Sequence, residues 1–576
     1  AEKAYKFYCI FKTRPSIMKQ WLLGLVLVAS GLFVHAQDQP PKNWFHLDLH
    51  QDNYPGVSTE KAYRELIKNR RGEEVIVAVI DSGVDAEHED LQEVMWVNGD
   101  EIPDNGKDDD QNGYADDLNG WNFIGNAEGQ NINYDNLEIT RLYVKYKKRF
   151  EGKSPDELGK KERKLYEDYQ EMGETIEKKS ESMSENATLY GMVKESLQDL
   201  KKDLGKSSEA IALDDLKNYQ SSDPLKSQIA TMAQTVMQDE GLTFEAMERD
   251  VADAYEYFYG QANYYYNTEF DPRDLVGDDF SNPEERYYGN SDVEGPDAEH
   301  GTHVAGIIGA VRGNGIGMDG VADKVRIMSI RTVPNGDERD KDVANAIRYA
   351  VDNGASIINM SFGKGYSPRK AIVDEAVKYA MKNDVLLVHA AGNDGKENNL
   401  ENNFPNDRFD KKGLLGPRYA KNWIEVGAFD WQGGEKLAAS FSNYSADLVD
   451  VFAPGTAMYS TVPDNKYRDL QGTSMAAPVV TGIAAVLRSY FPDLTAPQVK
   501  QIIMDSAVRQ KGKTILPGES DERVSFKELS VTGGLVNLYE AFRLAEKTKG
   551  KKKGVSRKIA PAPTDGNEAE EEQAMP

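Results

Sequence analysis

Cysteine and histidine are scarce in this 576-residue chain. The sequence has 1 Cys, Cys9, and 7 His, so thiol or imidazole chemistry has few candidates. Cys9 precedes a predicted export signal, and a chain that begins after that signal has no cysteine. Disulfide bonds are therefore excluded, and stability in an oxidising compartment must come from packing or from a bound metal ion.

Basic residues are also fewer than acidic residues. The sequence has 69 Lys+Arg against 96 Asp+Glu, which gives a formal net charge of -27. Proteins that bind nucleic acid use clustered cations to contact phosphates, so this composition predicts no nucleic-acid partner. The length allows a large buried core and indicates more than one structural unit.

The first 36 residues are predicted to lie outside the fold. Residues 18–36 combine a charged start, the apolar run "WLLGLVLVASGLFV" and small residues for cleavage after Ala36, as in a secretory signal peptide. Residues 1–17 lack an initiator Met and are interpreted as an upstream over-extension. The apolar run is too short to span a bilayer, and a retained membrane anchor is the alternative. We expect export to the periplasm or the extracellular space, with no stable membrane span after cleavage.

Six apolar, β-branched runs predict the strands of one large sheet. They are "EEVIVAVIDSGVD" from 73, "KVRIMSIRTV" from 324, "ASIINMSFG" from 355, "DVLLVHAAGND" from 384, "NWIEVGAFD" from 422 and "DLVDVFAPG" from 447. Amphipathic helical patterns follow two of these runs, at 341–354 and 368–384. Strands alternating with helices predict an α/β fold, a doubly wound, mainly parallel sheet with helices on both faces. Chemistry in such folds gathers at the carboxyl ends of the strands.

Composition divides the chain into further parts. Residues 127–285 are rich in Lys, Glu, Leu and Tyr at helical spacing and predict a largely α-helical insertion. It interrupts the α/β region, which is predicted to cover 71–126 and 286–546. Residues 37–70 would form an N-terminal arm, and the biased composition of 547–576 predicts a disordered tail.

Three motifs carry residues suited to nucleophilic chemistry. "VIDSGVD" ends a predicted strand at Asp81, "HGTHVAG" supplies His300 and His303, and "GTSMAAP" places Ser474 at the start of an alanine-rich helix. A serine hydroxyl becomes a nucleophile when a histidine accepts its proton and a carboxylate orients that histidine. The start of a helix also directs backbone N–H groups towards developing negative charge.

These motifs, in the order Asp, His, Ser, closely resemble those of the subtilisin-like serine peptidases, the subtilase family. The resemblance covers about 71 to 126 and 291 to 540, and it implies a subtilisin-like fold and serine endopeptidase activity on proteins or peptides. It also implies that Asp81 orients the base, that His300 is the base and that Ser474 is the nucleophile. The alternative is a weak or inactive family member that acts as a binding or scaffolding protein through its insertion.

The resemblance extends to the oxyanion and substrate sites. In "AAGND", Asn393 would donate its amide to the oxyanion, together with the backbone N–H of Ser474. In "NMSFG", the backbone of the segment Ser361, Phe362 and Gly363 would pair with the substrate as an added strand. The residues expected to line the primary specificity pocket are Ala390, Ala391 and Gly392.

Two further histidines are interpreted as structural. A zinc-binding pair on a helix is usually spaced i, i+4 with an acid between, whereas His300 and His303 are three apart with no third ligand nearby. We therefore expect His303 to be buried and hydrogen-bonded behind the base. His389 stands where the family usually has a small apolar residue; we expect a core histidine, and a residue that polarises the pocket is the alternative.

An acidic loop, "DNGKDDDQNGYADDLNGWNF", is the candidate for a structural calcium site. Its oxygen-bearing side chains recur around a glycine turn, as in calcium loops. The candidate ligands are Asp108, Asp110, Asn112, Asp116 and Asp117. Dense carboxylates repel one another without a cation, and a plain acidic turn is the alternative. No organic cofactor is expected.

The sequence does not specify how folding and access to the candidate active site are controlled. About 35 residues separate the predicted cleavage point from the first strand, too few for an independent prodomain. The chain is therefore expected to fold without one, or to use the insertion as a guard. The insertion re-enters just before His300, so it could act as a lid, as an exosite or as a contact for another envelope protein. The sequence does not specify an oligomeric state.

Overall fold

A computed structural model describes residues 39–239, 241–410 and 417–553, so the predicted signal peptide at 18–36, the over-extension at 1–17 and residues 554–576 lie outside it. Its centre is a nine-stranded sheet in the order β10-β13-β7-β6-β5-β4-β1-β3-β2. Its strands are β1 (Val75–Asp81), β2 (Gly120–Asn122), β3 (Val325–Arg331), β4 (Ile357–Met360), β5 (Leu386–Ala390), β6 (Trp423–Phe429), β7 (Val451–Pro454), β10 (Val508–Arg509) and β13 (Gly534–Leu535). Only β10 and β13 pair antiparallel within this described sheet.

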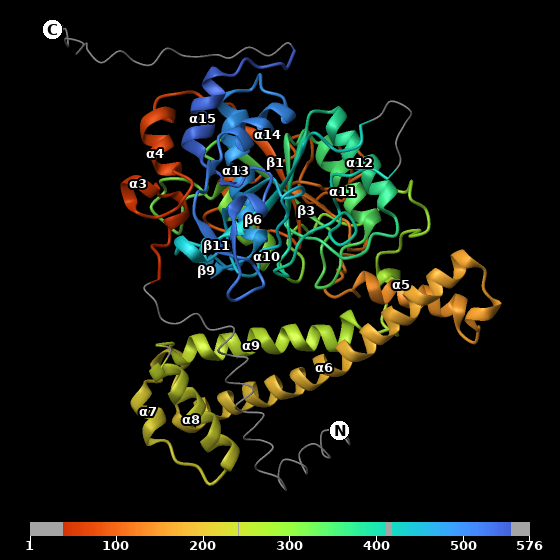
Figure 1. The fold of residues 1–576 in the computed structure, drawn as a ribbon, viewed down its shortest axis with the longest axis vertical. Helices are drawn as coiled ribbons and strands as arrows, with labels where there is room; N and C mark the ends of the chain where they lie inside the picture. The colour runs from red at the N-terminus through yellow and green to blue at the C-terminus, as the bar shows by residue number, and fades with distance from the viewer. Residues whose placement is uncertain (1–38, 240, 411–416, 554–576) are drawn as a thin grey trace, which may run out of the picture. The chain divides into compact units, whose positions relative to one another are not determined.

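Helices cover both faces of the sheet. On one face, α10 (Glu299–Gly309), α13 (Thr473–Tyr490) and α14 (Ala496–Asp505) pack with alternate residues of β1, Val77 and Val79. On the other face, α11 (Asp340–Asp352) and α12 (Lys370–Lys382) lie side by side (Figure 1) and pack with Ala78 and Ile80. Successive strand residues point to opposite faces, so β1 is buried on both. The predicted α/β, doubly wound, mainly parallel fold is confirmed.

Each of the six apolar runs contains a strand, but several short strands gave no such signal. They are β2, β10 and β13 of the large sheet and the two-stranded sheets β8 (Met458–Val462) with β9 (Lys466–Leu470) and β11 (Lys513–Ile515) with β12 (Arg523–Ser525). β9 reads "KYRDL" and is half-buried or exposed along its length. A short polar segment of this kind becomes a strand through its pairing partner rather than through its own pattern.

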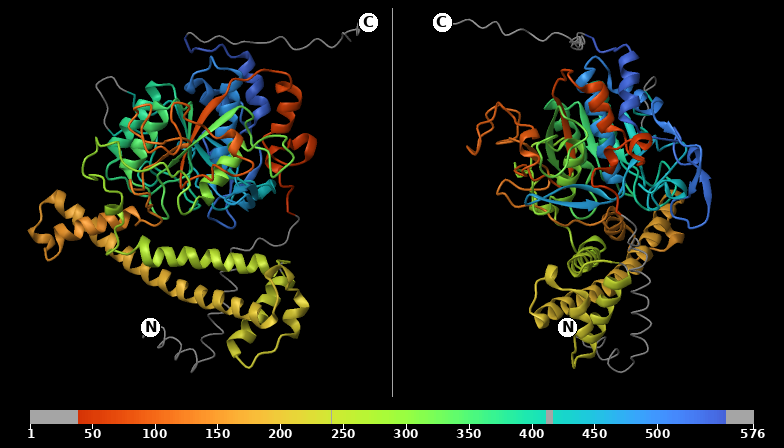
Figure 2. Two further views of the ribbon diagram at one scale, coloured as in Figure 1. Left: turned by 180° about the vertical axis from the view of Figure 1, so that it is seen from behind. Right: turned by 90° about the vertical axis from the view of Figure 1, so that its left-hand side faces the viewer.

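Residues 40–70 of the predicted arm belong to the same compact unit as the sheet. Trp44 and Phe45 are buried, and the arm contains α3 (Leu49–Asp52) and α4 (Thr59–Ala62). The backbone N–H of Leu538, at the start of α15 (Leu538–Lys547), donates to the carbonyl of Val57 at 2.8 Å, and α4 lies against α15 in both figures (Figure 2). Beyond α15, the described chain continues to 553, where Lys552 N–H donates to the carbonyl of Asp493.

Part of the predicted insertion forms a separate compact unit, residues 178–263. Its helices are α7 (Leu213–Asn218), α8 (Pro224–Asp239), α9 (Phe244–Gly260) and the second part of α6 (Lys160–Leu204). They share their own buried cluster, which includes Leu197, Ile229 and Phe244. Among the described residues, every helix falls short of the length or apolarity needed to cross a membrane.

The first helix of the insertion, α5 (Glu138–Phe150), belongs with the sheet. Its first residue, Glu138, accepts from Arg141 at 2.7 Å and from Lys364 at 3.0 Å, and all three side chains are largely buried. Burial raises the pKa of Glu138, but the charges of Lys364 and Arg141 outweigh this and lower it to about 2. Lys364 directly follows the predicted substrate-pairing segment, so a buried ion pair joins α5 to that segment.

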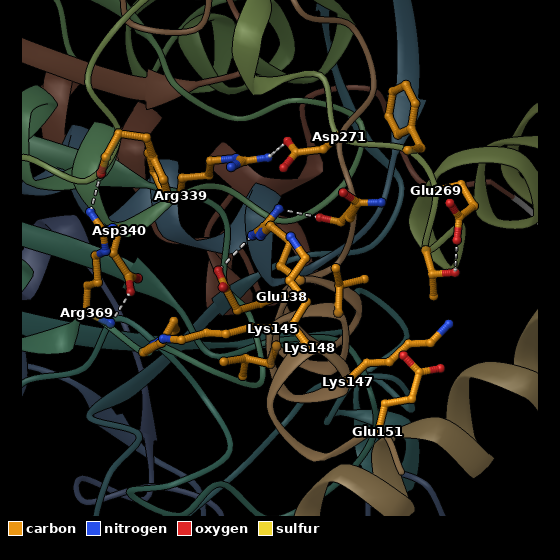
Figure 3. Close-up of a pocket in the computed structure, with 18 residues that line it drawn as sticks. Glu138, Lys145, Lys147, Lys148, Glu151, Glu269, Asp271, Arg339, Asp340 and Arg369 are labelled. Carbon is orange, nitrogen blue, oxygen red and sulfur yellow. Dashed lines mark hydrogen bonds and ion pairs between the residues drawn. The ribbon is translucent and has the colours of Figure 1, made fainter.

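Further ion pairs surround this contact (Figure 3). Arg339 binds Asp135 at 2.7 Å and Asp271 at 2.8 Å. Asp340 accepts the backbone N–H of Arg369 at 2.8 Å and also pairs with Lys364 at 2.9 Å. Glu138, Arg339 and Asp340 line a cavity of about 770 Å³. Figure 3 shows Arg339 pointing to Asp271 and Asp340 lying beside Arg369. Residues from within and after the insertion thus hold α5 in place.

We expect Glu138→Gln to destabilise the protein by about 3 kcal/mol at pH 7, because it removes one counter-charge from the buried side chains of Lys364 and Arg141 and leaves Asp340 and Asp135 as their salt-bridge partners. The pKa of Glu138 falls from an ordinary 4.5 to about 2, so its contribution is present above pH 4.5 and is lost as the pH falls towards 2. The difference in thermal midpoint between wild type and variant should therefore shrink on acidification. Glu162→Gln, which removes an exposed pair with Arg149, is the matched control and should change the midpoint little. Equal midpoints for Glu138→Gln and wild type at pH 7 would contradict this role.

Candidate active site

Asp81 and His300 meet at the carboxyl end of β1. His300 lies in the first turn of α10, and its Nδ1 is 2.7 Å from Oδ1 of Asp81, which also accepts the backbone N–H of Ser82. Gly301 makes this approach possible: a Cβ at Gly301 would lie 2.0 Å from the carbonyl oxygen of Gly83. The side chain of Asp81 is 2% exposed, whereas that of His300 is 39% exposed. The acid is therefore sheltered and the imidazole remains accessible.

The electrostatic surroundings of His300 favour its charged form. Burial lowers its pKa, but the charge of Asp81, the hydrogen bond to Asp81 and the charges of Asp297 and Glu299 outweigh burial and raise it above 6.5. His303 behaves in the opposite way, because burial lowers its pKa to about 3, and its Nε2 lies 3.1 Å from the carbonyl oxygen of Arg468. The structure thus places a carboxylate beside one of the two histidines of the motif.

Ser474 is the second residue of α13, and a chain of hydrogen bonds fixes its backbone. Thr481 donates to Asn359, Asn359 donates to the hydroxyl of Ser361, and that hydroxyl donates to the carbonyl of Ser474 at 2.8 Å. The hydroxyl of Ser474 itself donates to the carbonyl of Ser361 at 3.1 Å. Among the described residues no hydrogen bond joins Ser474 to His300 in this conformation. Such contacts often tighten only when substrate binds.

Asn393 follows β5 and faces the start of α13. Its Oδ1 accepts from the backbone N–H of Thr473 at 2.8 Å and from the Thr473 hydroxyl at 2.9 Å. Because Oδ1 is engaged in this way, the amide NH₂ group is the end of Asn393 that remains to donate. The N–H of Ser474 is one of the first-turn donors for which a helix has no internal acceptor. Two donors therefore flank the nucleophile candidate.

A cavity of about 470 Å³ adjoins Ser474. Five of the six predicted substrate-binding residues line it: Ser361, Phe362, Gly363, Ala390 and Gly392. Ala391 is not among the described lining residues; it is buried, and its carbonyl accepts from Asn398, Asn403 and Asn443. Further lining residues come from other segments and gave no sequence signal: Leu137, Ile139, Asp337, Tyr366, Asn402, Asn403 and Asn443.

His389 is fully buried behind this cavity. Its Nδ1 lies 2.9 Å from Oε2 of Glu425, which also accepts from the indole of Trp423. Its Nε2 has no hydrogen-bond partner among the described residues. His389 is thus a core histidine with one end unsatisfied.

The acidic loop brings together only part of the predicted calcium ligands. Carboxylate oxygens of Asp110, Asp117 and Glu101 lie within 4.8 Å of one another. Asn112 donates its amide to both Asp110 and Asp117 at 3.0 Å. Burial raises the pKa of Asp117 to about 6 against the hydrogen bonds that lower it. Glu101 precedes the loop in the sequence, and no local sequence pattern marks it as a metal ligand.

The other two predicted calcium ligands bind backbone instead. Asp108 accepts the backbone N–H groups of Asn112 and Gly113, and Asp116 accepts those of Asn105 and Gly106. Their carboxylates thus shape the turns of the loop rather than face the carboxylate cluster.

The fold and this geometry define an α/β protein with an Asp–His pair at the carboxyl end of a central strand and a serine in the first turn of a buried helix. The subtilase family model (Peptidase_S8) matches residues 72–557, and the chain belongs to that family. The thermophilic serine proteinase of Bacillus sp. (strain AK1) is 41% identical over 191 residues, 33% of this chain and 42% of that protein. Subtilisin DY of Bacillus licheniformis is 38% identical over 210 residues, 36% of this chain and 70% of that protein. Family and relatives together support a serine peptidase.

The chain therefore spans less than half the length of the first of these relatives. Among solved structures, proteases from Pseudoalteromonas arctica PAMC 21717 match with a TM-score of 0.44 and 18% identity, over 88% of this chain and 97% of that chain.

We expect the imidazole of His300 to titrate above pH 6.5 in NMR spectra of protein labelled at histidine. In Asp81→Asn its pKa should fall, because burial lowers it and the variant removes the charge of Asp81 that most strongly opposes burial. His46 and His303, both with a pKa lowered to about 3, are internal controls that stay neutral in the same spectra. An unchanged His300 titration in Asp81→Asn would show that the 2.7 Å contact does not govern this group.

Proposed function

We propose that this protein is an exported serine endopeptidase that hydrolyses peptide bonds of proteins or peptides with Asp81, His300 and Ser474 as its catalytic triad. The observation that carries the proposal is the 2.7 Å contact between His300 and the sheltered Asp81, in a chain of the subtilase family. The signal-peptide pattern at 18–36 supports export. The insertion at 127–285 is the candidate surface for contact with another envelope protein.

The proposed reaction uses these groups in two steps. Nε2 of His300 takes the proton of Ser474 as Oγ attacks the substrate carbonyl carbon, and Asp81 holds the imidazole and stabilises its charged form. The amide of Asn393 and the N–H of Ser474 stabilise the oxyanion. The imidazolium then gives its proton to the leaving amine, and water hydrolyses the acyl-enzyme by the same route. The hydroxyl of Ser474 must first turn from the carbonyl of Ser361 to His300.

We also propose a structural Ca²⁺ site formed by Glu101, Asp110 and Asp117, with Asn112 beside them. Three carboxylates within 4.8 Å repel one another, and a divalent cation would offset that charge. Carboxylate and amide oxygens are the ligands that calcium prefers, so the residues fit the ion. The amide of Asn112 would turn its oxygen, in place of its NH₂, towards the ion.

A fluorophosphonate probe should label the purified protein at Ser474. Ser474→Ala should abolish labelling, and Asn393→Ala should lower kcat by roughly 10²–10³, because one oxyanion donor is lost. The measurements are mass spectrometry of the labelled peptide and cleavage of a fluorogenic peptide. Labelling that persists in Ser474→Ala would remove Ser474 as nucleophile, and an unlabelled wild-type protein would favour the scaffolding alternative.

Calcium should raise the thermal midpoint of protein pre-treated with chelator. Asp117→Asn should abolish this rise, because it removes a buried ligand from the cluster. Asp108→Asn is the control: its side chain caps backbone N–H groups, so the rise should persist from a lower starting midpoint. The same midpoint with chelator and with calcium in the wild type would leave the loop as a plain acidic turn.

A further inference from the structure

The side chain of Asn403 lies next to Gly363 in the lining of the cavity beside Ser474. Both residues line the cavity. A Cβ at Gly363 would lie 2.9 Å from Oδ1 of Asn403 and 3.7 Å from Nε2 of His389. The atoms nearest to this position are therefore polar: the amide oxygen of Asn403, the carbonyl oxygen of Phe404 and a ring nitrogen of His389.

The orientation of the Asn403 amide is fixed from behind. Its NH₂ group donates to Oε1 of Glu425 at 2.9 Å and to the carbonyl of Ala391 at 3.2 Å, so both of its hydrogens are used. Turning the amide over would place Oδ1 against the carboxylate of Glu425, which is unfavourable. Oδ1 of Asn403 is therefore held as an acceptor.

Glu425 is itself held firmly. Its Oε2 accepts from the indole of Trp423 at 2.9 Å and lies 2.9 Å from Nδ1 of His389, and its backbone N–H donates to Asp450 at 3.0 Å. Glu425 is 6% exposed, so its charge acts through a medium of low dielectric constant. It adds negative potential behind the acceptor of Asn403.

The other side-chain amides of the cavity are already engaged at their oxygens. Oδ1 of Asn443 accepts from the N–H groups of Asp394 and Lys396, and Oδ1 of Asn402 accepts from that of Asn399. Oδ1 of Asn393 accepts from Thr473. Among the described amides that line the cavity, Asn403 has the oxygen that is left for a substrate.

We propose that Asn403, oriented by Glu425, makes this pocket select a substrate side chain that donates a hydrogen bond at P1, the residue whose carbonyl is attacked. This inference rests on the proposed peptidase function and names its substrate class. A glutamine at P1 satisfies Oδ1 of Asn403, whereas a methionine of the same length leaves that acceptor buried and unpaired. A site built to hydrogen-bond its ligand rejects the analogue that lacks the donor.

The test uses the full chain and two fluorogenic peptides that differ only at P1, Gln or Met. The wild-type ratio of kcat/KM for Gln over Met should be about 10 to 100, as expected for one unsatisfied buried acceptor. Asn403→Leu removes the acceptor at similar size and should bring the ratio to 1 or below. Glu425→Gln releases the amide and should give an intermediate ratio. Asn399→Leu, an exposed change in the same loop, is the matched control and should keep the wild-type ratio.

Fluorophosphonate labelling of each variant separates the two possible failures. Labelled wild-type protein with a Gln/Met ratio near 1 overturns the inference and leaves the proposed function standing. A labelled Asn403→Leu variant with the wild-type ratio also overturns it, because the selectivity then comes from elsewhere. Wild-type protein that is neither labelled nor active overturns the proposed function, and this inference falls with it. If Asn403→Leu is not labelled, the wild-type ratio and that of Glu425→Gln test the inference, and equal ratios for these two proteins overturn it.

Discussion

The close contact between α10 and the turn after β1 is the constraint on which the site depends. A Cβ at Gly301 would lie 2.0 Å from the carbonyl oxygen of Gly83 and 3.2 Å from the Cβ of Asp81, so any larger residue would push the helix away. Ser460 and Thr461 of β8 hold α10 on another side by donating to carbonyls at its start. The 2.7 Å approach of His300 to Asp81 is available only while α10 is pressed against this turn.

Sequence patterns predicted the strands and the motif residues, because each of these depends on a short continuous segment. The β-branched runs identified the long strands because burial on both faces demands apolar residues at every position. Asp81 and Ser474 stood out through their motifs. His300 could not be ranked over His303 from the residues alone, since both belong to one motif. The structure separates them, because a carboxylate faces one and a backbone carbonyl faces the other.

Residues whose role arises from distant contacts could not be predicted. Glu425 reads as one polar position in a strand, and its partners Asn403 and His389 lie 22 and 36 residues away. Glu101 stands apart from the acidic loop, yet its carboxylate joins that of Asp117. Ala391 was predicted to line the pocket from its motif, but strand geometry buries it and uses its carbonyl to hold three amides. No local pattern encodes such pairings.

The insertion consists of two physically different parts. Its beginning supplies Leu137 and Ile139 to the cavity, and between them Glu138 pairs with Lys364, the residue after Gly363. The side chain of Lys364 is 1% exposed, and Glu138 of α5 supplies one of its two carboxylate partners, the other being Asp340 of α11, so α5 supports this wall of the cavity. Residues 178–263 have their own buried core. Changes in that helical unit can therefore alter what the insertion contacts while α5 keeps the shape of the cavity.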